Sequence, residues 1–485
     1  MTKRGQSKEL HSKEFYSKEL KDSHSRKRKA QSAPGKSVKS KETFTAHEGS
    51  REQRSIEAVS RVRSPAPNSK KSFSTSRKDN DKESIDASDE EVFRLMGRAL
   101  THSRWYHGLM PRDEIEDLIK NEGDFLVRKT EVKKAPKYAV SVMNKDRLRH
   151  ILLNYRDGSW WLRETKKTSV SELIDFHVKE KAPVQSDGTI LVTPVPRPDF
   201  YILHEHVDVK VRVGGGAFGE VFTGSFKKSD SETVDVAVKK LKGMMKKKQR
   251  LEFIREAKLM KRFDHPNIVR VFGVAIQEEP VMIVLELAAG GSLQGHLKAH
   301  PETSIEQLLN YCKDAARGMC YLSSRQVIHR DIAARNCLLG ASDELKISDF
   351  GLSIADTSVV KLEKLRSMPV KWLAPETLRK GEFSSKTDVW SYGILVWEIF
   401  SRCKADPFPG DSNAEAKKKI LGSGPGSPPM SAPDGCPEEG LKLMQLCFTQ
   451  NPDERADFEV LFKLLAPNEA LPQPQPCGDS CVKRV

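Results

Sequence analysis

The chain has 485 residues, of which 37% are hydrophobic and 31% charged, and its formal net charge is +15. This length predicts two or three folded units at roughly 150 residues each, and no apolar run reaches the roughly 18 residues that a membrane-spanning helix needs. These properties argue against an integral membrane protein and favour a soluble protein of several domains.

The two ends of the chain and its cysteines indicate the compartment. The N-terminus lacks the apolar core of a secretory signal, and Thr2 stands where N-myristoylation requires glycine. Cys481 lies one residue too far from the C-terminus for prenylation. The eight cysteines lack metal-ligand spacing. We therefore expect a cytoplasmic protein, with a peripheral position at the plasma membrane and a nuclear pool as further locations.

Residues 1–100 are rich in Ser, Lys, Arg, Glu and Gln and show no apolar periodicity, which predicts disorder. Most of the net positive charge lies in residues 1–80. Three interpretations of this basic region remain open: solvated disorder, attraction to an anionic membrane surface, and nuclear import or nucleic-acid contact through the basic residues 26–29. Nucleic acid is the least favoured partner, because few aromatic residues are present to stack on bases.

The N-terminal block, which we place at residues 104–195, begins with a helical pattern after Pro111. Alternating apolar residues at 138–142 and 150–153 predict antiparallel strands, and a second helical pattern covers 170–177. The proline-rich stretch at 194–198 cannot continue a helix. It predicts a stiff linker at residues 196–203.

Three motifs of this block carry a family resemblance: Trp-Tyr-His-Gly at 105–108, Gly-Asp-Phe-Leu-Val-Arg at 123–128 and Arg-His at 149–150. Together they resemble a Src-homology-2 (SH2) domain. An arginine that ends an apolar strand is often only a solvated edge charge, but the resemblance implies that Arg128 grips phosphotyrosine bidentately. It implies tyrosine-phosphorylated proteins as partners and a pocket formed by Arg112, Arg128, Thr130 and His150.

The C-terminal block, placed at residues 204–466, opens with glycines at the first, third and sixth positions of 214–219. Such glycines let backbone N–H groups approach phosphate oxygens. They also occur in dinucleotide-binding turns, but a helix would then have to follow, and 220–222 are strand-like. Lys239 ends the strand-like run 236–239, and Glu256 in the helical segment 251–263 could orient it toward nucleotide phosphates.

The segment 329–336 then supplies Asp331 and Asn336, and Asp349 follows in Asp-Phe-Gly. Phosphoryl transfer needs one carboxylate to orient the acceptor hydroxyl, and another carboxylate with an amide to hold Mg²⁺ or Mn²⁺. Asp331 fits the first role, and Asn336 with Asp349 fits the second. Each residue alone could be a helix cap or turn residue. Their combined order indicates phosphotransfer chemistry.

With these motifs, the C-terminal block resembles a eukaryotic protein kinase domain. Residues 372–376, the run 388–393 and Arg455 match further kinase motifs. The resemblance implies a bilobal domain that binds ATP and acts on protein substrates, with Lys239, Glu256, Asp331, Arg335 and Asn336 as catalytic residues. It assigns the nucleotide site to Val213, Gly214, Gly215, Gly216, Ala217, Phe218, Gly219, Val221, Ala237, Lys239, Leu285, Glu286 and Ala288.

The residues around Asp331 favour tyrosine as the acceptor. Serine/threonine kinases usually carry lysine where Ala333 stands, whereas Ala333 and Arg335 fit the tyrosine class, as does the substrate-side loop with Pro369 and Trp372. An SH2 domain joined to such a kinase most resembles the Fes and Fer group of non-receptor tyrosine kinases. The expected fold class is α+β: an SH2 domain with a central antiparallel sheet between two helices, followed by a β-rich small lobe and a helical large lobe.

Two departures leave alternatives open. The segment 349–375 contains no tyrosine, so we expect control through Thr357, Ser358 or Ser367, or through docking of the SH2 domain on the small lobe. A catalytically inactive adaptor that binds phosphotyrosine is the rival function, although inactive kinases generally lose one of the catalytic residues present here. Residues 467–485 are predicted to be unstructured.

Overall fold

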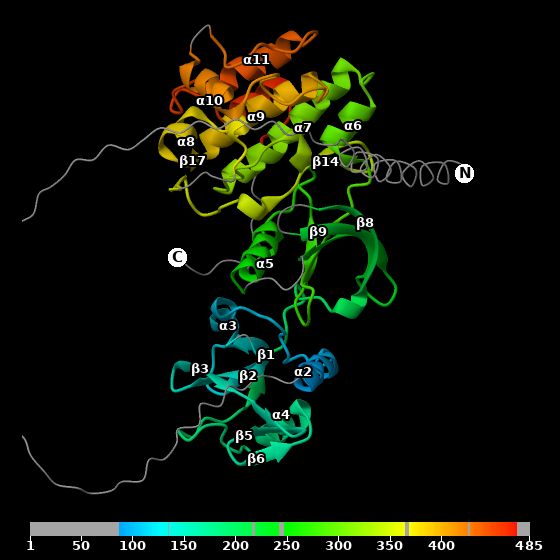
Figure 1. The fold of residues 1–485 in the computed structure, drawn as a ribbon, viewed down its shortest axis with the longest axis vertical. Helices are drawn as coiled ribbons and strands as arrows, with labels where there is room; N and C mark the ends of the chain where they lie inside the picture. Colours follow the sequence, from blue (N-terminus) through cyan, green and yellow to red (C-terminus); the bar gives the residue numbers. More distant parts are fainter. Residues whose placement is uncertain are drawn as a thin grey trace, which may run out of the picture. The chain divides into compact units, whose positions relative to one another are not determined.

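The computed structural model describes residues 87–133, 135–215, 219–241, 247–363, 368–424 and 427–472 (Figure 1). The expectations for residues 1–86, for the glycine-rich residues 216–218, for Ser367 and for residues 473–485 lie outside this part. The fold is mixed α+β, as expected. None of the helices in the described part combines the length and the apolar character needed to cross a membrane.

A helix, α2 (Ala87–Leu100), precedes the N-terminal block. Its residues Phe93 and Leu100 are buried, and the Phe93 ring lies 5.6 Å from Tyr138 and 4.9 Å from Trp160. The prediction of disorder up to residue 100 is therefore wrong for its last 14 residues. The polar composition of the whole segment concealed a short stretch whose apolar residues recur at helical spacing.

The N-terminal block is built on a four-stranded sheet in the order β3-β2-β1-β7, in which only β7 runs parallel to its neighbour. A small second sheet, β4-β5-β6, adjoins it. The bounds are α3 (Arg112–Leu118), β1 (Asp124–Val132), β2 (Ala135–Asn144), β3 (Arg147–Leu152), β4 (Asn154–Arg156), β5 (Ser159–Leu162), β6 (Thr165–Lys167), α4 (Val170–Lys179) and β7 (Thr193–Pro194).

The alternation of side chains along β1 decides which helix covers which face of the sheet. Phe125 and Val127 belong to the same core cluster as the buried residues of α4, whereas Leu126 joins the cluster that contains Ile115 of α3. Arg128 follows Leu126 by two positions. It therefore lies on the face that α3 covers.

The C-terminal block begins with a five-stranded sheet in the order β11-β12-β10-β9-β8, which we call the small lobe together with helix α5. The strands pair antiparallel throughout. The bounds are η1 (His204–His206), β8 (Val207–Gly215), β9 (Gly219–Lys227), β10 (Thr233–Leu241), α5 (Lys247–Lys261), β11 (Val271–Ala275) and β12 (Met282–Glu286).

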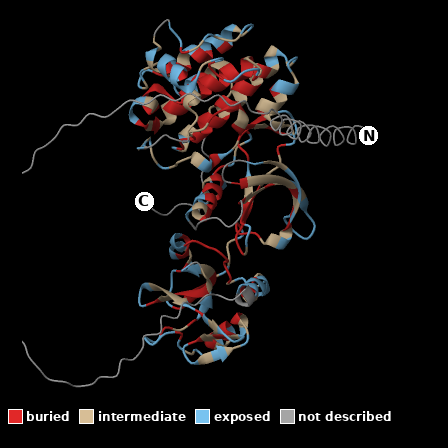
Figure 2. Cartoon of the chain, viewed as in Figure 1, coloured by how far each residue is buried: buried red, intermediate tan, exposed pale blue. Residues whose placement is uncertain are grey.

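The large lobe is mainly helical, and an almost fully buried helix, α9, lies within it (Figure 2). Two short antiparallel strands, β14 and β15, lie between residues 334–336 and Asp349 in the chain. The bounds are β13 (Gly291–Ser292), α6 (Leu293–Ala299), α7 (Ile305–Ser324), η2 (Ala334–Asn336), β14 (Cys337–Leu339), β15 (Leu345–Ile347), η3 (Phe350–Leu352), β16 (Val359–Lys361), η4 (Val370–Trp372), α8 (Pro375–Lys380), β17 (Glu382–Ser384), α9 (Ser385–Phe400), α10 (Asn413–Gly422), α11 (Glu438–Cys447) and α12 (Phe458–Leu465).

The start of the predicted C-terminal tail is packed rather than unstructured. Glu469 forms ion pairs with Lys313 and Arg317 of α7, and Leu471 lies against the core of the large lobe. The prediction is wrong for these residues. Their proline-rich sequence suggested an extended chain, but long-range contacts with α7 hold it in place.

A buried ion pair joins Glu376 of α8 to Arg455, with nitrogen–oxygen distances of 2.7 and 3.0 Å. Arg455→Met leaves the Glu376 carboxylate buried without its partner, so we expect a loss of about 3–5 kcal/mol in the free energy of unfolding of the large lobe. Chemical denaturation of the full chain measures it. The double variant Arg455→Met/Glu376→Leu should lose much less, and equal losses in both variants would contradict this explanation.

Candidate active site and anion pocket

Three charged side chains from separate elements meet between the lobes. The Nζ atom of Lys239, on β10, lies 2.6 Å from Oε1 of Glu256, on α5, and 3.3 Å from Oδ1 of Asp349. The Lys239 and Glu256 side chains are largely buried, whereas that of Asp349 is 52% exposed. The structure thus brings together three residues that lie far apart in the sequence.

The environment shifts the proton affinities of this group. Burial by itself lowers the pKa of Lys239, but the carboxylates of Glu256 and Asp349 outweigh it and raise that pKa above its usual value. Burial raises the pKa of Glu256 despite the adjacent ammonium group. Burial also opposes ionisation of Asp349, but Lys239 prevails and lowers its pKa. A cation and an accessible anion are thereby held side by side.

The segment 329–336, which we call the catalytic loop, brings Asp331, Arg335 and Asn336 into direct contact. The amide nitrogen of Asn336 donates to the backbone carbonyl and to Oδ2 of Asp331, both at 2.7 Å. Arg335 donates to the other carboxylate oxygen at 2.5 Å. Because both oxygens accept hydrogen bonds, the orientation of the Asp331 carboxylate is fixed.

Two buried carboxylates of α9 stabilise this loop by accepting hydrogen bonds from its backbone. Asp388 accepts hydrogen bonds from the backbone N–H groups of His329 at 2.7 Å and Arg330 at 2.8 Å. Glu398 accepts from the backbone of Ala334 at 2.9 Å. Burial raises the pKa of both acids to about 7. Sequence reasoning missed Glu398, although an acid within the apolar run 389–400 was a signal for it.

The substrate-side loop is connected to the catalytic loop through Trp372. Its ring lies 4.5 Å from the guanidinium carbon of Arg335, and its indole nitrogen donates to Glu398 at 3.1 Å. Pro369 is the N-cap of the short helix η4 that carries this tryptophan, and its carbonyl accepts from the Trp372 backbone. Both predicted residues of this loop therefore lie in one hydrogen-bonded turn, in which Trp372 contacts Arg335.

The residues predicted to bind nucleotide lie on neighbouring strands of the small lobe. Strand pairing sets Gly214 opposite Val221 and Ala237 opposite Leu285. Ala288, just beyond β12, is buried. The remaining members have the following places: Val213 and Gly215 on β8, Gly219 on β9, Glu286 at the end of β12, and Gly216, Ala217 and Phe218 outside the described residues.

A second charged site lies in the N-terminal block, around Arg128. This arginine is only 4% exposed, and its Nε and Nη2 atoms have no hydrogen-bond partner in the described part of the chain. Burial and the nearby Arg112 lower its pKa to about 10. A buried guanidinium group without a counter-charge is costly, which points to an anionic ligand from outside the chain.

His150 and Thr130 complete the predicted pocket. His150, on β3, shares a hydrogen bond of 2.9 Å with Ser141. Burial, followed by the charges of Arg128 and Arg112, lowers the pKa of His150 to about 4, so the ring is neutral at pH 7. Thr130 follows Arg128 by two positions on β1 and shares its face of the sheet.

The anion pocket and the active site are connected through packed helices. Ile115 of α3 lies in one apolar cluster with Phe253 and Ile254 of α5, the helix that carries Glu256. Glu114 of α3 pairs with Lys258 of α5 at 3.1 Å. The position of α5 is thus supported from the N-terminal block.

The backbones of the two blocks also approach closely. The N–H group of Leu109 donates to the carbonyl of Ile276 at 2.8 Å. A Cβ atom on Gly108, where φ is +58°, would lie 2.3 Å from the same carbonyl oxygen. Only glycine permits this approach.

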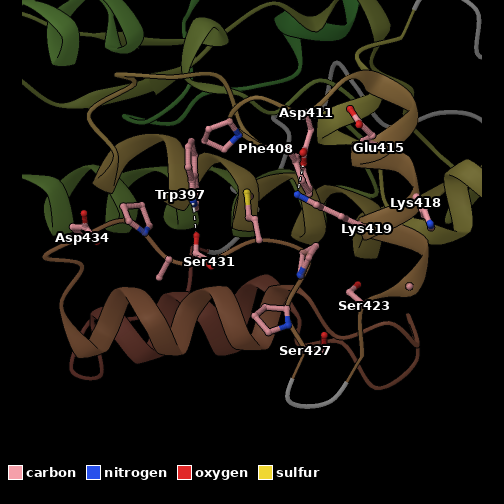
Figure 3. Close-up of a pocket in the computed structure, with 17 residues that line it drawn as sticks. Trp397, Phe408, Asp411, Glu415, Lys418, Lys419, Ser423, Ser427, Ser431 and Asp434 are labelled. Atoms are coloured by element: carbon pink, nitrogen blue, oxygen red, sulfur yellow. Dashed lines mark hydrogen bonds and ion pairs between the residues drawn. The ribbon is translucent and has the colours of Figure 1, made fainter.

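A separate cavity of about 1030 Å³ lies in the large lobe, between α10 and the loop that follows it (Figure 3). Trp397 and Phe408 line it, and Lys419 pairs with Asp411 across its rim at 2.6 Å. Among the described residues, none of those predicted for catalysis or nucleotide binding lines this cavity. The site chemistry lies elsewhere.

Comparison with known families supports two domains. The family described as protein tyrosine and serine/threonine kinase matches residues 207–465, and the SH2 domain family matches residues 105–177. Both matches fall on the blocks in which the two charged sites lie.

Individual relatives cover both domains. Over 379 residues the chain is 40% identical to the human tyrosine-protein kinase Fer, a match that spans 77% of this chain and 45% of the relative. It is 39% identical to Fer-related kinase 1 of Caenorhabditis elegans, over 75% of this chain and 93% of the relative. The transforming protein Fps of an avian sarcoma virus is 37% identical, over 74% and 67% respectively. The chain thus spans less than half the length of mammalian Fer.

Proposed function

This chain belongs to the Fer-related protein kinases with an SH2 domain, and we propose that it transfers the γ-phosphate of ATP to tyrosine hydroxyls of protein substrates. The observation that carries this proposal is the meeting of Lys239, Glu256 and Asp349, in a lobed domain whose Asp331 carboxylate is fixed by Asn336 and Arg335. These are the groups that phosphoryl transfer requires.

In this mechanism Asp331 orients the acceptor hydroxyl and accepts its proton, and Lys239 holds the α- and β-phosphates of ATP. The residues that would hold Mg²⁺ or Mn²⁺ are Asn336 and Asp349. They fit a hard cation, because both carry oxygen ligands: the Asn336 amide uses its nitrogen toward Asp331 and retains its oxygen as an acceptor, and Asp349 offers a half-exposed carboxylate. A cation held by these two residues would neutralise charge on the phosphates.

The proposal that tyrosine rather than serine is the acceptor rests on the residues around Asp331. Ala333 is buried, and Arg335 is held between Asp331 and the ring of Trp372. No lysine projects beside Asp331 at the position that serine kinases use. Incubation of the purified chain with ATP, Mg²⁺ and a Glu/Tyr copolymer tests the assignment, and phosphoserine as the main product on mixed substrates would refute it.

The SH2 domain supplies the second part of the proposed function. Its buried Arg128, whose Nε and Nη2 atoms have no hydrogen-bond partner among the described residues, is suited to a phosphotyrosine group on a partner protein, with Arg112, Thr130 and His150 nearby. Capture of phosphorylated proteins would bring substrates to the active site. A pure adaptor, the rival function, would retain this pocket without catalysis.

We also propose that docking of the SH2 domain on α5 supports activity, because α5 carries Glu256. Lys258→Ala leaves Glu114 buried without its partner, and we expect kcat to fall about fivefold to tenfold. The measurement is copolymer phosphorylation at saturating ATP. Arg255→Ala is the matched control, since its pair with Asp113 is exposed and contributes little. Equal rates for both variants would contradict the docking proposal.

For the protein as a whole we propose a cytoplasmic location. The basic N-terminal region is suited to anionic membrane surfaces by its charge, with nuclear import as the alternative.

A further inference from the structure

The activation segment, residues 349–375, is held in place at its start by backbone bonds to the catalytic loop. Ile328 and Ile354 exchange two hydrogen bonds of 2.9 and 3.0 Å. The Nε atom of Arg330 donates to the carbonyl of Leu352 at 2.5 Å. These bonds need no modification of any side chain.

A short β-ladder holds the middle of the segment. Strand β16 pairs antiparallel with β17, and Val360 lies opposite Phe383. Val360 and Leu362 pack against a buried cluster of Ile328, Leu373 and Phe383. Apolar residues therefore occupy the stretch in which tyrosine kinases of this type usually carry the phosphorylated tyrosine.

An ion pair ties the segment to the small lobe. Asp356 accepts two hydrogen bonds from Arg262, just beyond the end of α5, at 2.7 and 2.8 Å. The guanidinium group and the carboxylate meet in the bidentate geometry that arginine also uses for phosphate. Arg262 lowers the pKa of Asp356, first through these hydrogen bonds, which keeps the carboxylate ionised at neutral pH.

Arg330 of the catalytic loop, a basic residue that could pair with a phosphate on the segment, is already engaged. Its guanidinium carbon lies 5.4 Å from the centre of the Phe383 ring, and its Nε atom bonds to Leu352. Its guanidinium group forms no salt bridge within the described part of the chain, but against the effect of burial, which lowers its pKa, the buried carboxylate of Asp388 raises that pKa. The Phe383 ring, the Leu352 carbonyl and Asp388 together stabilise this cation without a phosphate.

We propose that Asp356 and Arg262 are positioning residues that take the place of activation-segment phosphorylation. Kinases commonly order this segment through new pairs between a phosphate and arginine. Here the carboxylate of Asp356 supplies the anion, and the Val360 ladder supplies the remaining order. The segment is competent for catalysis without a phosphate. This inference rests on the proposed kinase function.

The test begins with the full chain, treated with a broad-specificity phosphatase and shown by mass spectrometry to carry no phosphate in residues 349–375. After phosphatase removal, we expect copolymer phosphorylation to start without a lag and at an undiminished rate. Asp356→Asn should lower kcat about threefold to fivefold, as expected for an exposed pair of favourable geometry, with the KM for ATP little changed. Asp356→Glu should retain most of the activity.

Exchanging the charges of Arg262 and Asp356 tests whether the pair positions the activation segment or only stabilises the fold. Arg262→Asp should lose activity, and Arg262→Asp combined with Asp356→Arg should regain part of it. Asp230→Asn, which removes an exposed carboxylate paired with Lys227 in the β9–β10 turn, should have no effect. Thermal unfolding of each variant excludes global loss of structure as the cause.

The outcomes separate the two proposals. Absence of any incorporation by the wild-type chain, whether phosphorylated or not, would refute the proposed function. Activity that appears only after Thr357, Ser358 or Ser367 is phosphorylated would overturn the inference alone, as would full activity of Asp356→Asn.

Discussion

Replacement of Asp331 by asparagine is expected to lower kcat by about 100-fold to 10,000-fold, the range that a positioned general base contributes. Asparagine keeps the size of the side chain and can still accept from the Asn336 amide, but it cannot take a proton from the tyrosine hydroxyl. The KM for ATP should change little, because Asp331 does not contact the groups assigned to the nucleotide. Initial rates of copolymer phosphorylation at several ATP concentrations measure both constants.

Asp453→Asn is a suitable control, since it makes the same chemical change at an exposed carboxylate of the large lobe. It should leave kcat unchanged. If Asp331→Asn and the wild-type chain incorporate phosphate equally, the catalytic assignment fails. If neither incorporates any, the adaptor function is favoured.

Replacement of Arg128 by leucine should weaken binding of a phosphotyrosine peptide by about 100-fold to 1,000-fold. Loss of one partner from a buried, hydrogen-bonded charge pair costs about 2–5 kcal/mol, and each 1.4 kcal/mol changes affinity tenfold. The affinity of Arg128→Lys for the peptide should lie between those of the wild-type chain and Arg128→Leu, because lysine keeps the charge and loses the bidentate geometry. Fluorescence anisotropy with the full chain and labelled peptides measures the affinities.

Arg156→Leu provides the matched comparison, because Arg156 is an exposed arginine of the same domain. It should bind the phosphopeptide as the wild-type chain does, and an unphosphorylated peptide should bind to none of these proteins. An Arg128→Leu protein that retains its affinity would place phosphotyrosine outside this pocket.

The sequence predicted the architecture and the family well, because motifs such as 329–336 and 123–128 are short, ordered and chemically specific. The placement of Lys239 beside Glu256 followed from the same pattern. The motifs do not specify the distances between these side chains, and the substitutions described above test the individual site assignments.

What the sequence did not predict depends on contacts between distant segments. Helix α2 was missed, because Phe93 is stabilised by Tyr138 and Trp160 rather than by local propensity. The Arg262 and Asp356 pair joins two residues 94 positions apart, neither of which belongs to a motif. Glu398 was not identified, because it lies among the apolar residues of α9 and belongs to none of the motifs.

The unpartnered guanidinium group of Arg128 has a consequence for the empty SH2 domain. A buried cation without a counter-charge makes the unliganded fold less stable than a leucine at the same place would. The pocket thus lowers the free energy of unfolding of the empty domain, and a bound phosphate raises it again. The phosphate of the partner therefore stabilises the folded SH2 domain and is also the group that the domain recognises.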